Sequence, residues 1–324
     1  MNMKKNHAVS ILVPAYNAGK YISECLESIV NQTLSDIEII VLDDGSTDNT
    51  GAIVKMYAEK DHRITVIHQD NSGIIKARKK LLEIASGEYV GFVDADDFIK
   101  PDMYEKMYRA AISQDADMVM CDYAFYPKKN RKKRKWYTPY SGQVDSRFLD
   151  SNNQHWNKIV KRELIEKYEI AKWHETCGEG AYTLVLLFAK RIVSINEELY
   201  FYRLGHNSIS SNWNNVKWFE ENIKKSIRMK ELIDYYGLNE KWGDLYLSKI
   251  SFCYIQGMIV AAYNNKKSIY MRMRKENKEY KQYNKILKKN VDEDFGKTKS
   301  LVMRKVIPSS YYLAKWISKA ALNI

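Results

Sequence analysis

Short apolar segments alternate with amphipathic segments from Ala8 to about Tyr126. Five apolar segments rich in β-branched and aromatic residues predict strands at 9–13, 37–42, 64–67, 89–93 and 118–123. Between them, apolar residues recur every three or four positions and predict helices at 21–32, after Asn49, at 74–85 and from Pro101 onward. Because strands that are apolar along their whole length are buried on both faces, the pattern predicts an α/β fold: a mostly parallel sheet with helices on both faces.

Carboxylates follow two of the predicted strands. Asp43 and Asp44 follow the second strand, and Asp94, Asp96 and Asp97 follow the fourth. Parallel strands end at the same edge of a sheet, where open α/β sheets bind ligands. Taken alone, the second group could equally be an acidic turn that caps the next helix. Two acidic groups at one edge favour a ligand site, because like charges need a cation or a donor-rich ligand, and oxygen ligands suit Mg²⁺ or Mn²⁺.

Other residues are placed to line the same edge. Pro14 ends the first predicted strand, and Tyr16 after it could stack on a nucleobase or simply cover the sheet. Asp44 could accept a hydrogen bond from a base imide, or belong to a tight turn that caps the next helix. Asn71 precedes the third helix at a Ser-Gly turn that lets a ligand approach the backbone. Arg78 could bind phosphate as a bidentate donor, although a single helical arginine is more often solvated.

Five sequence segments, taken in order, resemble the family 2 glycosyltransferases, which have the GT-A fold. They read VSILVPAYN, SECLESIVNQT, EIIVLDDGSTD, NSGIIKAR and ASGEYVGFVDADDFIKPD. The resemblance is strong from Val9 to Asp122 and weaker over Trp156–Ile165 and Leu199–Ser210. It implies inverting transfer of a sugar from a nucleotide donor, usually a UDP-sugar, with Mn²⁺ or Mg²⁺ at the Asp-x-Asp element. The acceptor would be a hydroxyl of a glycan or of a polyprenyl-diphosphate-linked glycan, as in bacterial surface-polysaccharide assembly.

By position, the resemblance implies roles for seven residues in binding the donor. Pro14, Tyr16 and Asp44 would bind the base and ribose, Asn71 and Arg78 would line the diphosphate pocket, Asp94 would contact the ribose, and Asp96 would bind the metal. The segment after the first strand, VPAYNAGKY, is not the Gly-rich phosphate loop of a Rossmann dehydrogenase or of a sugar-phosphate nucleotidyltransferase.

The chain departs from the family pattern at two places. Its third helix has Ala77-Arg78-Lys79 where Ala-Arg-Asn is usual. The catalytic base of the family lies in a Gly-Glu-Asp element, which here reads Gly178-Glu179-Gly180, so the expected aspartate is missing. Glu179 is the first candidate for the base that deprotonates the acceptor, followed by Glu175 and His174. The departure also leaves open a catalytically impaired homologue that binds a nucleotide-sugar or a membrane partner without transfer.

The 324 residues are 45% hydrophobic and carry a net charge of +12, with a pI of about 9.2. This composition is globular, and the charge favours an anionic neighbour such as a membrane surface. The most basic segment, PKKNRKKRK at 127–135, is either a solvated loop or a contact for anionic lipid or a diphosphate-bearing acceptor. No nucleic-acid-binding module accompanies it, so nucleic acid is not expected as a partner. Four dispersed cysteines fit neither a zinc site nor a disulfide framework, which indicates a reducing compartment.

Beyond Asn215 the pattern is almost entirely helical. We expect two regions, a GT-A domain at 1–214, with a nucleotide-binding half at about 8–126 and an acceptor half at about 136–214, and a helical region at 215–324. The segment 301–324 mixes aromatic, aliphatic and basic residues, and could lie in a membrane interface or pack on the catalytic domain or on another subunit. No signal peptide and no membrane-spanning apolar run is evident. We therefore expect a cytoplasmic protein, peripheral at the inner face of the cell membrane, and leave its oligomeric state open.

Overall fold

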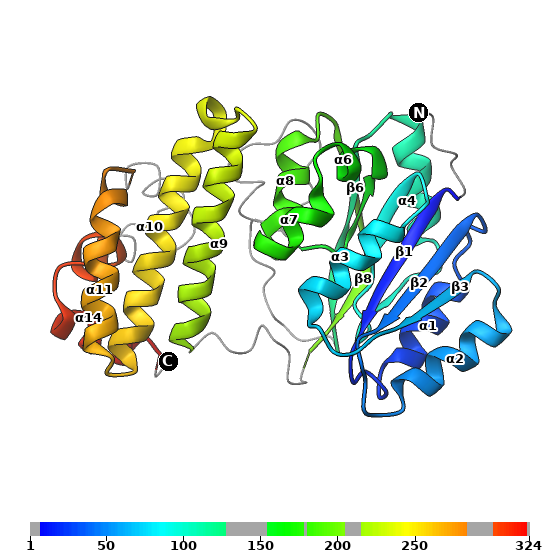
Figure 1. The fold of residues 1–324 in the computed structure, drawn as a ribbon, viewed down its shortest axis with the longest axis horizontal. Coiled ribbons are helices and arrows are strands. Elements are labelled where there is room, and N and C mark those ends of the chain that lie inside the picture. The colour runs from blue at the N-terminus through cyan, green and yellow to red at the C-terminus, as the bar shows by residue number, and fades with distance from the viewer. Residues whose placement is uncertain (1–6, 128–153, 178–179, 205–214, 284–300, 323–324) are drawn as a thin grey trace. The chain divides into compact units, whose positions relative to one another are not determined.

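The computed structural model describes residues 7–127, 154–177, 180–204, 215–283 and 301–322. The chain divides into two compact units, Met1–His206 and Asn207–Ile324. The first unit holds a sheet with its helices, and the second is helical (Figure 1). Two features of the sequence analysis, the basic segment from Lys128 onward and the candidate base Glu179, lie outside the described residues.

One eight-stranded sheet forms the centre of the first unit, in the order β3-β2-β1-β4-β7-β6-β8-β5. The strands are β1 Val9–Ala15, β2 Ile37–Asp43, β3 Ile64–His68, β4 Tyr89–Phe92, β5 Phe98–Ile99, β6 Met118–Tyr126, β7 Lys158–Lys161 and β8 Ile192–Arg203. The first four strands of that order are parallel. β7 is antiparallel to both of its neighbours, β6 and β8 are parallel, and β5 is antiparallel to β8. The sheet is mostly parallel, which confirms the predicted fold class.

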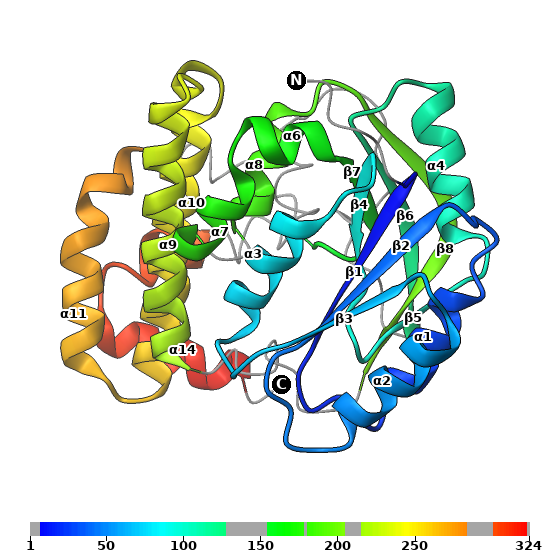
Figure 2. The same cartoon turned by 45° about the vertical axis from the view of Figure 1, so that its right-hand side comes forward.

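Helices cover both faces of the sheet. The described helices of this unit are α1 Ile22–Val30, α2 Thr50–Lys60, α3 Ile74–Ile84, α4 Met103–Ser113, α6 Arg162–Lys167, α7 Ile170–Cys177 and α8 Gly180–Phe188. Buried residues of α1, α2 and α4 belong to one apolar core with Val9, Ile11 and Val13, which point to one face of β1. α3 contacts β1 and β2, and α7 contacts α3. Figure 2 shows α3 on the side of the sheet opposite α1 and α2.

We predicted that Pro14 ends the first strand, and this prediction is wrong. β1 continues to Ala15, and Pro14 lies opposite Leu42 of β2. Pairing with β4 stops at Leu12, whose carbonyl accepts a hydrogen bond from the N–H of Val93. Alternate residues of a strand present their backbone groups to opposite neighbours, so the missing N–H of Pro14 faces the side where β4 has already turned away. A proline therefore fits inside this strand.

Where the structure describes it, the second unit consists of helices, as predicted beyond Asn215. Its elements are α9 Val216–Tyr235, α10 Asn239–Tyr263, α11 Lys267–Glu276, a 3₁₀ helix Asn277–Tyr283, a π-helix Val302–Val306 and α14 Tyr311–Leu322. α10 contacts α9, α11 and α14. Residues from all four of these helices form one apolar core, which includes Phe219, Met258, Tyr270 and Ala314. α9 ends before Gly237, whose φ of 68° stops the helix.

Among the described helices, α10 is the one whose length and composition would allow it to cross a membrane, with a mean hydropathy of 1.3 over its most apolar window. We expected no such segment, because the sequence has no uninterrupted apolar run of that length. Within the structure, 67% of that window is buried by the surrounding helices. This burial is the pattern of a helix in a protein core.

Candidate functional site

The carboxyl ends of β2, β1 and β4 meet at one edge of the sheet, as the sequence predicts. Asp43 ends β2 and lies opposite Ala15 at the end of β1. The parallel strand β4, on the other side of β1, ends at Phe92, two residues before Asp94. The two acidic groups therefore follow parallel strands that flank β1, at the edge where α/β sheets bind ligands.

Hydrogen bonds join the loops that follow β1 and β2. Asn17, whose φ is 49°, accepts a hydrogen bond from the N–H of Thr47 at 2.9 Å, and its own N–H donates to Oγ of Ser46 at 3.0 Å. The side chain of Tyr16, next to this junction, is 52% exposed and can present its ring to a nucleobase. Pro14 is buried within β1, so its contribution to a ligand site is the backbone geometry ahead of Tyr16.

Asp44 is a buried carboxylate that holds the loop before α3. Its Oδ1 accepts hydrogen bonds from Nε2 of Gln69 at 2.6 Å and from the N–H and Oγ of Ser72 at 2.9 and 3.1 Å. Its Oδ2 accepts one from the N–H of Gly73 at 2.8 Å. Burial alone would raise the pKa of Asp44, but these hydrogen bonds outweigh it and lower the pKa. Asp44 is thus an ionised acceptor, and Oδ2 has the capacity for a second donor such as a base imide.

Asn71 lies exposed in the same loop and packs against the turn after β2. Gly45 in that turn has a φ of 73°, and a Cβ atom added to it would lie 2.6 Å from the backbone nitrogen of Asn71. The position requires glycine both for its backbone conformation and for space. The Asp44–Gly45 turn and the Asn71 loop therefore form one continuous part of the sheet edge.

Arg78 on α3 forms an ion pair with Asp94. Its Nη2 donates to Oδ1 of Asp94 at 2.8 Å, and the two side chains are 6% and 24% exposed. The guanidinium carbon also lies 5.9 Å from the centre of the Phe92 ring, which is within cation–π range. The alternative of a solvated helical arginine is therefore wrong. The pair places a guanidinium beside the acidic turn that follows β4.

Asp97 is a buried carboxylate whose partners the sequence analysis did not identify. Its side chain is 1% exposed; Oδ2 accepts from the hydroxyl of Tyr200 at 2.7 Å, and Oδ1 accepts from the N–H of Arg203 at 2.7 Å. Burial raises the pKa of Asp97 well above its usual range, and the charges of Asp94 and Asp96 raise it further. The same Tyr200 hydroxyl accepts from the N–H of Asp94 at 3.2 Å, so one tyrosine of β8 holds both ends of the acidic turn.

Arg203, at the end of β8, holds the same turn from its other side. Its Nε donates to the main-chain oxygen of Asp96 at 2.7 Å, and its Nη2 donates to Glu24 of α1 at 2.5 Å. Its guanidinium carbon lies 5.1, 5.5 and 5.0 Å from the ring centres of Tyr21, Phe98 and Tyr126. The one sequence signal for Tyr200 and Arg203 is that both belong to the segment LYFYR, in the weaker part of the family resemblance.

The acidic turn fits a metal ion that takes only one or two of its ligands from the protein. Asp94 is held by Arg78 and Asp97 by Tyr200, and no group of three metal-ligating side chains occurs within the described residues. The side chain of Asp96 is partly exposed. One or two carboxylates suit Mg²⁺ or Mn²⁺ when water and donor phosphates supply the other oxygens. The turn therefore matches a metal site that is completed by water and by the phosphates of a nucleotide-sugar. It does not match a site in which protein side chains supply all the ligands.

The three candidates for the catalytic base lie in α7 or directly after it. Glu179 and the side chain of Glu175 lie outside the described part of the chain. His174 is buried, with its ring centre 5.4 Å from that of His155. Burial and the positive charge of Arg78 lower the pKa of His174 to about 3. Its burial and weak basicity both disfavour His174 as the group that deprotonates an acceptor.

These features define the class of protein. A mostly parallel sheet with Asp44, the Arg78–Asp94 pair and an Asp-x-Asp turn at its carboxyl edge is the architecture of a nucleotide-sugar-dependent glycosyltransferase of the GT-A fold. The family model described as "Glycosyl transferase family 2" matches residues 10–178, more than half of the chain. The chain therefore belongs to glycosyltransferase family 2, a family of inverting enzymes.

Known proteins resemble the chain in sequence and in fold. Glycosyltransferase GlyG of Streptococcus pneumoniae is 33% identical over 232 residues, which cover 67% of this chain and 77% of GlyG. The crystal structure of S. aureus TarS 1-349 in complex with UDP-GlcNAc has a TM-score of 0.69 at 19% identity, covering 94% of this chain and 91% of TarS. Mannosyltransferase PcManGT from Pyrobaculum calidifontis, in complex with GDP-Man and Mn²⁺, has a TM-score of 0.55 at 15% identity, covering 99% and 88% of the two chains. At these identities the two structures show the likeness of fold alone.

Proposed function

We propose that this protein transfers a sugar from a UDP-sugar, in a metal-dependent reaction, to a hydroxyl of a glycan or of a polyprenyl-diphosphate-linked glycan. The observation that carries the proposal is the Arg78–Asp94 pair in the acidic turn with Asp96, at the sheet edge that also holds Asp44. A guanidinium and a metal-binding carboxylate together can neutralise a diphosphate, and an ionised acceptor nearby can recognise the base.

The choice of uridine rests on Asp44. Its Oδ2 accepts one protein hydrogen bond and can accept another from the imide N–H of uracil, while the exposed ring of Tyr16 can stack on the base. TarS, which has the same fold, was solved with UDP-GlcNAc, and this supports a UDP-sugar. PcManGT was solved with GDP-Man, so the fold by itself does not select the base.

The proposed cofactor is Mn²⁺ or Mg²⁺, held by Asp96. When bound, the metal ion would neutralise the charge that develops on the leaving diphosphate. The Mn²⁺ in PcManGT supports this assignment. Tyr200 and Arg203 would keep the Asp96 turn in place, because together they bind the N–H of Asp94, the main-chain oxygen of Asp96 and the carboxylate of Asp97.

The reaction needs one base and no covalent intermediate. Arg78 would bind a phosphate oxygen of the donor and orient the diphosphate as leaving group. The carboxylate of Glu179 would take the proton of the acceptor hydroxyl. The acceptor oxygen would then form its bond to the anomeric carbon as the bond from that carbon to the diphosphate oxygen breaks, and the electron pair would leave with UDP. Attack from the face opposite the leaving group inverts the configuration at the anomeric carbon.

A screen of donors tests the proposal. The full chain is incubated with UDP-, GDP- and TDP-sugars and Mn²⁺, and the release of nucleoside diphosphate is measured with and without a glycan acceptor. We expect release from a UDP-sugar, faster with acceptor, and weaker in the variant Asp44→Asn. Release from GDP- or TDP-sugars in preference to every UDP-sugar would overturn the choice of uridine.

A second candidate function is that of a nucleotide-sugar-binding homologue without transfer. The observation that favours it is Gly180, which stands where the family has its catalytic aspartate. The same screen separates the two functions. UDP binding by calorimetry, without turnover against a broad panel of acceptors, would identify the non-catalytic protein.

We further propose that the chain works in the cytoplasm, peripheral at the inner face of the cell membrane, where polyprenyl-linked acceptors are found. Within this proposal, residues 1–214 form the glycosyltransferase domain and residues 215–324 provide a membrane-surface or oligomer contact. The basic composition of the chain supports the location, since anionic lipid attracts clustered lysine and arginine. Fractionation of cells that express the full chain, with membranes washed in high salt, tests it.

A further inference from the structure

The net positive charge of the chain lies entirely in its second unit. Residues 207–324 contain 23 lysines and arginines but 11 aspartates and glutamates, so their net charge of +12 equals that of the whole chain. Residues 1–206 contain 29 of each and are neutral. An excess of this size in a helical unit of modest length attracts an anionic surface and opposes self-association of the unit.

α14 in this unit has one buried face and one exposed face. Tyr311, Ala314 and Ser318 are 8%, 0% and 1% exposed, and the first two belong to the apolar core of the unit. These positions follow the three- and four-residue spacing of a helix face. α14 packs on α10 and also contacts α11, as Figures 1 and 2 illustrate. The helix is therefore anchored, and its orientation about its own axis is fixed.

The exposed face of α14 is aromatic and basic. Trp316 and Tyr312 are 71% and 69% exposed, Leu313 is 42% exposed, and Lys319 is exposed beside them. Tyr312, Trp316 and Lys319 are again spaced by four and three residues, so they share one face. An anchored helix usually turns such side chains inward, because exposing two large aromatic rings forgoes the free energy of burying them.

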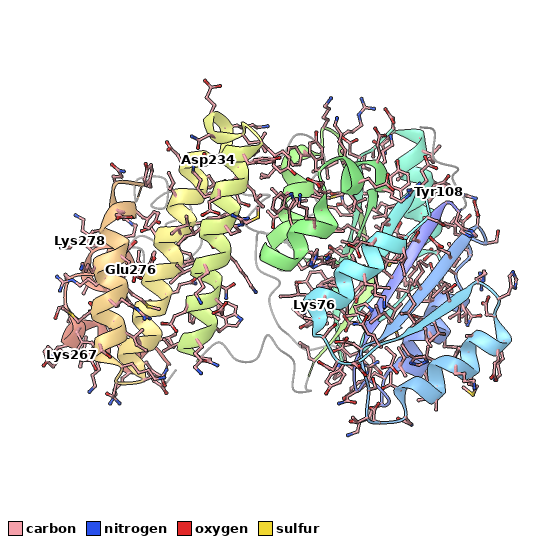
Figure 3. All side chains as sticks on the ribbon, in the orientation of Figure 1. Lys76, Tyr108, Asp234, Lys267, Glu276 and Lys278 are labelled. Atoms are coloured by element: carbon pink, nitrogen blue, oxygen red, sulfur yellow. The ribbon has the colours of Figure 1, made fainter. Side chains whose placement is uncertain are left out.

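α11 adds basic and apolar side chains next to this face. Nζ of Lys267 donates a hydrogen bond to the hydroxyl of Tyr312 at 3.1 Å and lies 4.9 Å from the centre of its ring. Met271, one turn further along α11, is 44% exposed. Figure 3 shows Lys267 at one end of α11 and Glu276 at the other. We call the surface of Lys267, Met271, Tyr312, Leu313, Trp316 and Lys319 the α14 patch.

We propose that the α14 patch binds the surface of an anionic lipid membrane. Tryptophan and tyrosine place an apolar ring at the depth of the lipid headgroups, while lysine extends to the phosphates, and this combination is typical of interfacial helices. A second copy of the chain is a poorer occupant, because it would bring another +12 unit against the first. The inference deepens the proposed function and rests on it for the choice of a membrane-linked acceptor, but its test does not need sugar transfer.

Vesicle sedimentation of the full chain tests the proposal. We expect binding to vesicles of phosphatidylcholine with phosphatidylglycerol, little binding to phosphatidylcholine alone, and weaker binding at high salt. The double variant Tyr312→Ser/Trp316→Ser should weaken binding at least tenfold, because it removes the interfacial rings. The separate charge variant Lys267→Gln/Lys319→Gln should weaken binding to anionic vesicles by roughly a factor of ten relative to the wild type. All these side chains are exposed, so the thermal stability of the variants should match the wild type.

A matched control is the double variant Tyr235→Ser/Trp218→Ser, which removes two aromatic rings of α9 that are 71% and 42% exposed. It should bind vesicles as the wild type does. Equal binding by the wild type and the α14 variants would overturn the proposal, and so would loss of a dimer in light scattering without loss of vesicle binding. Nucleotide release from a soluble UDP-sugar should be unchanged in the α14 variants. If the chain binds vesicles through the patch but releases no nucleotide, the membrane proposal holds and the proposed sugar transfer is refuted.

Discussion

Nη2 of Arg78 lies 2.8 Å from Oδ1 of Asp94, and this ion pair joins α3 to the acidic turn that follows β4. Arg78 is nearly buried, whereas Asp94 remains partly open to solvent. A buried guanidinium keeps its charge, so the pair holds a fixed positive group at the sheet edge. The pair also fixes the direction of the Asp94 side chain, two positions before the proposed metal ligand Asp96.

Arg78→Lys tests the role of this pair. Lysine keeps the positive charge but cannot donate to Asp94 and to a phosphate from one rigid plane. We expect the KM for the sugar donor to rise roughly tenfold or more, with a smaller change in kcat, as measured by nucleotide release. Lys60→Ala, which removes an exposed basic side chain from α2, should leave both constants unchanged. A donor KM unaffected by Arg78→Lys would contradict the assignment of Arg78 to the diphosphate.

Much of the nucleotide-binding half could be predicted from the sequence because β1 to β4 are nearly all apolar and parallel. Ile37–Leu42 has no other stable place than between two layers of helices, and its end fixes where Asp43 and Asp44 lie. The end of β1 was harder to predict. Pro14 normally marks a strand end, and only the absence of a β4 partner at that position lets the strand continue to Ala15.

Asp96→Ala tests the metal assignment. We expect donor hydrolysis and sugar transfer to fall together by roughly a hundredfold or more, because the charge on the leaving diphosphate would lose its compensation. Removing metal from the wild type with a chelator should have the same effect, and Mn²⁺ should reverse it there but not in the variant. Asp102→Ala, which removes a carboxylate paired with Lys106 outside the turn, is the matched control and should stay active. Full activity of Asp96→Ala with Mn²⁺ would place the metal elsewhere.

Tyr200→Phe tests the support of the acidic turn. The change removes the donor to the buried carboxylate of Asp97 and the acceptor for the N–H of Asp94. We expect the free energy of unfolding in denaturant to fall by about 1–3 kcal/mol, and the donor KM to rise, because the turn loses its anchor. Tyr89→Phe is a matched control, since it removes a buried hydroxyl that donates to the main-chain oxygen of Ala116, at the amino end of β4. Tyr89→Phe should lower the free energy of unfolding to a similar extent and leave the donor KM unchanged. If both variants raise the donor KM, Tyr200 affects donor binding only through the stability of the fold.

The contacts of Tyr200 and Arg203 show why part of the site could not be predicted. Asp97 and Tyr200 are 103 positions apart, and they meet because Phe98 and Ile99 of β5 pair antiparallel with Phe201 and Tyr200 of β8. A pairing of two residues on each strand is too short to leave a periodic signal in the sequence. Asp44 and Asp94 were easier to place, because each lies within two residues of the end of a strand whose apolar pattern is strong.

His174→Leu tests the view that this histidine is a buried neutral group. With a pKa of about 3 in the folded protein and about 6.5 in the unfolded chain, the unfolded state binds more protons between these values, so His174 costs the wild type stability as the pH falls from 6.5 to 3. The free energy of unfolding of His174→Leu should therefore exceed that of the wild type increasingly toward acid, by up to about 1.4 kcal/mol per pH unit. Denaturant unfolding at several pH values measures this. A difference that stays constant from pH 7 to pH 4 would refute it, and lost transfer at pH 7 with intact donor hydrolysis would restore His174 as a candidate base.

Glu179→Gln tests the assignment of the catalytic base. Glutamine has nearly the same shape as glutamate but cannot take a proton, so transfer to the acceptor should fall by at least about a hundredfold, a typical contribution of general-base catalysis. The Kd for UDP, measured by calorimetry, should stay within about twofold of the wild type, because Asp44, Arg78 and Asp96 are unchanged. Glu175→Gln is the matched control from the same segment of the chain. If Glu179→Gln transfers sugar at the rate of the wild type while Glu175→Gln does not, Glu175 is the base. If both variants transfer sugar at the rate of the wild type, neither glutamate replaces the aspartate missing at Gly180, and the base lies elsewhere.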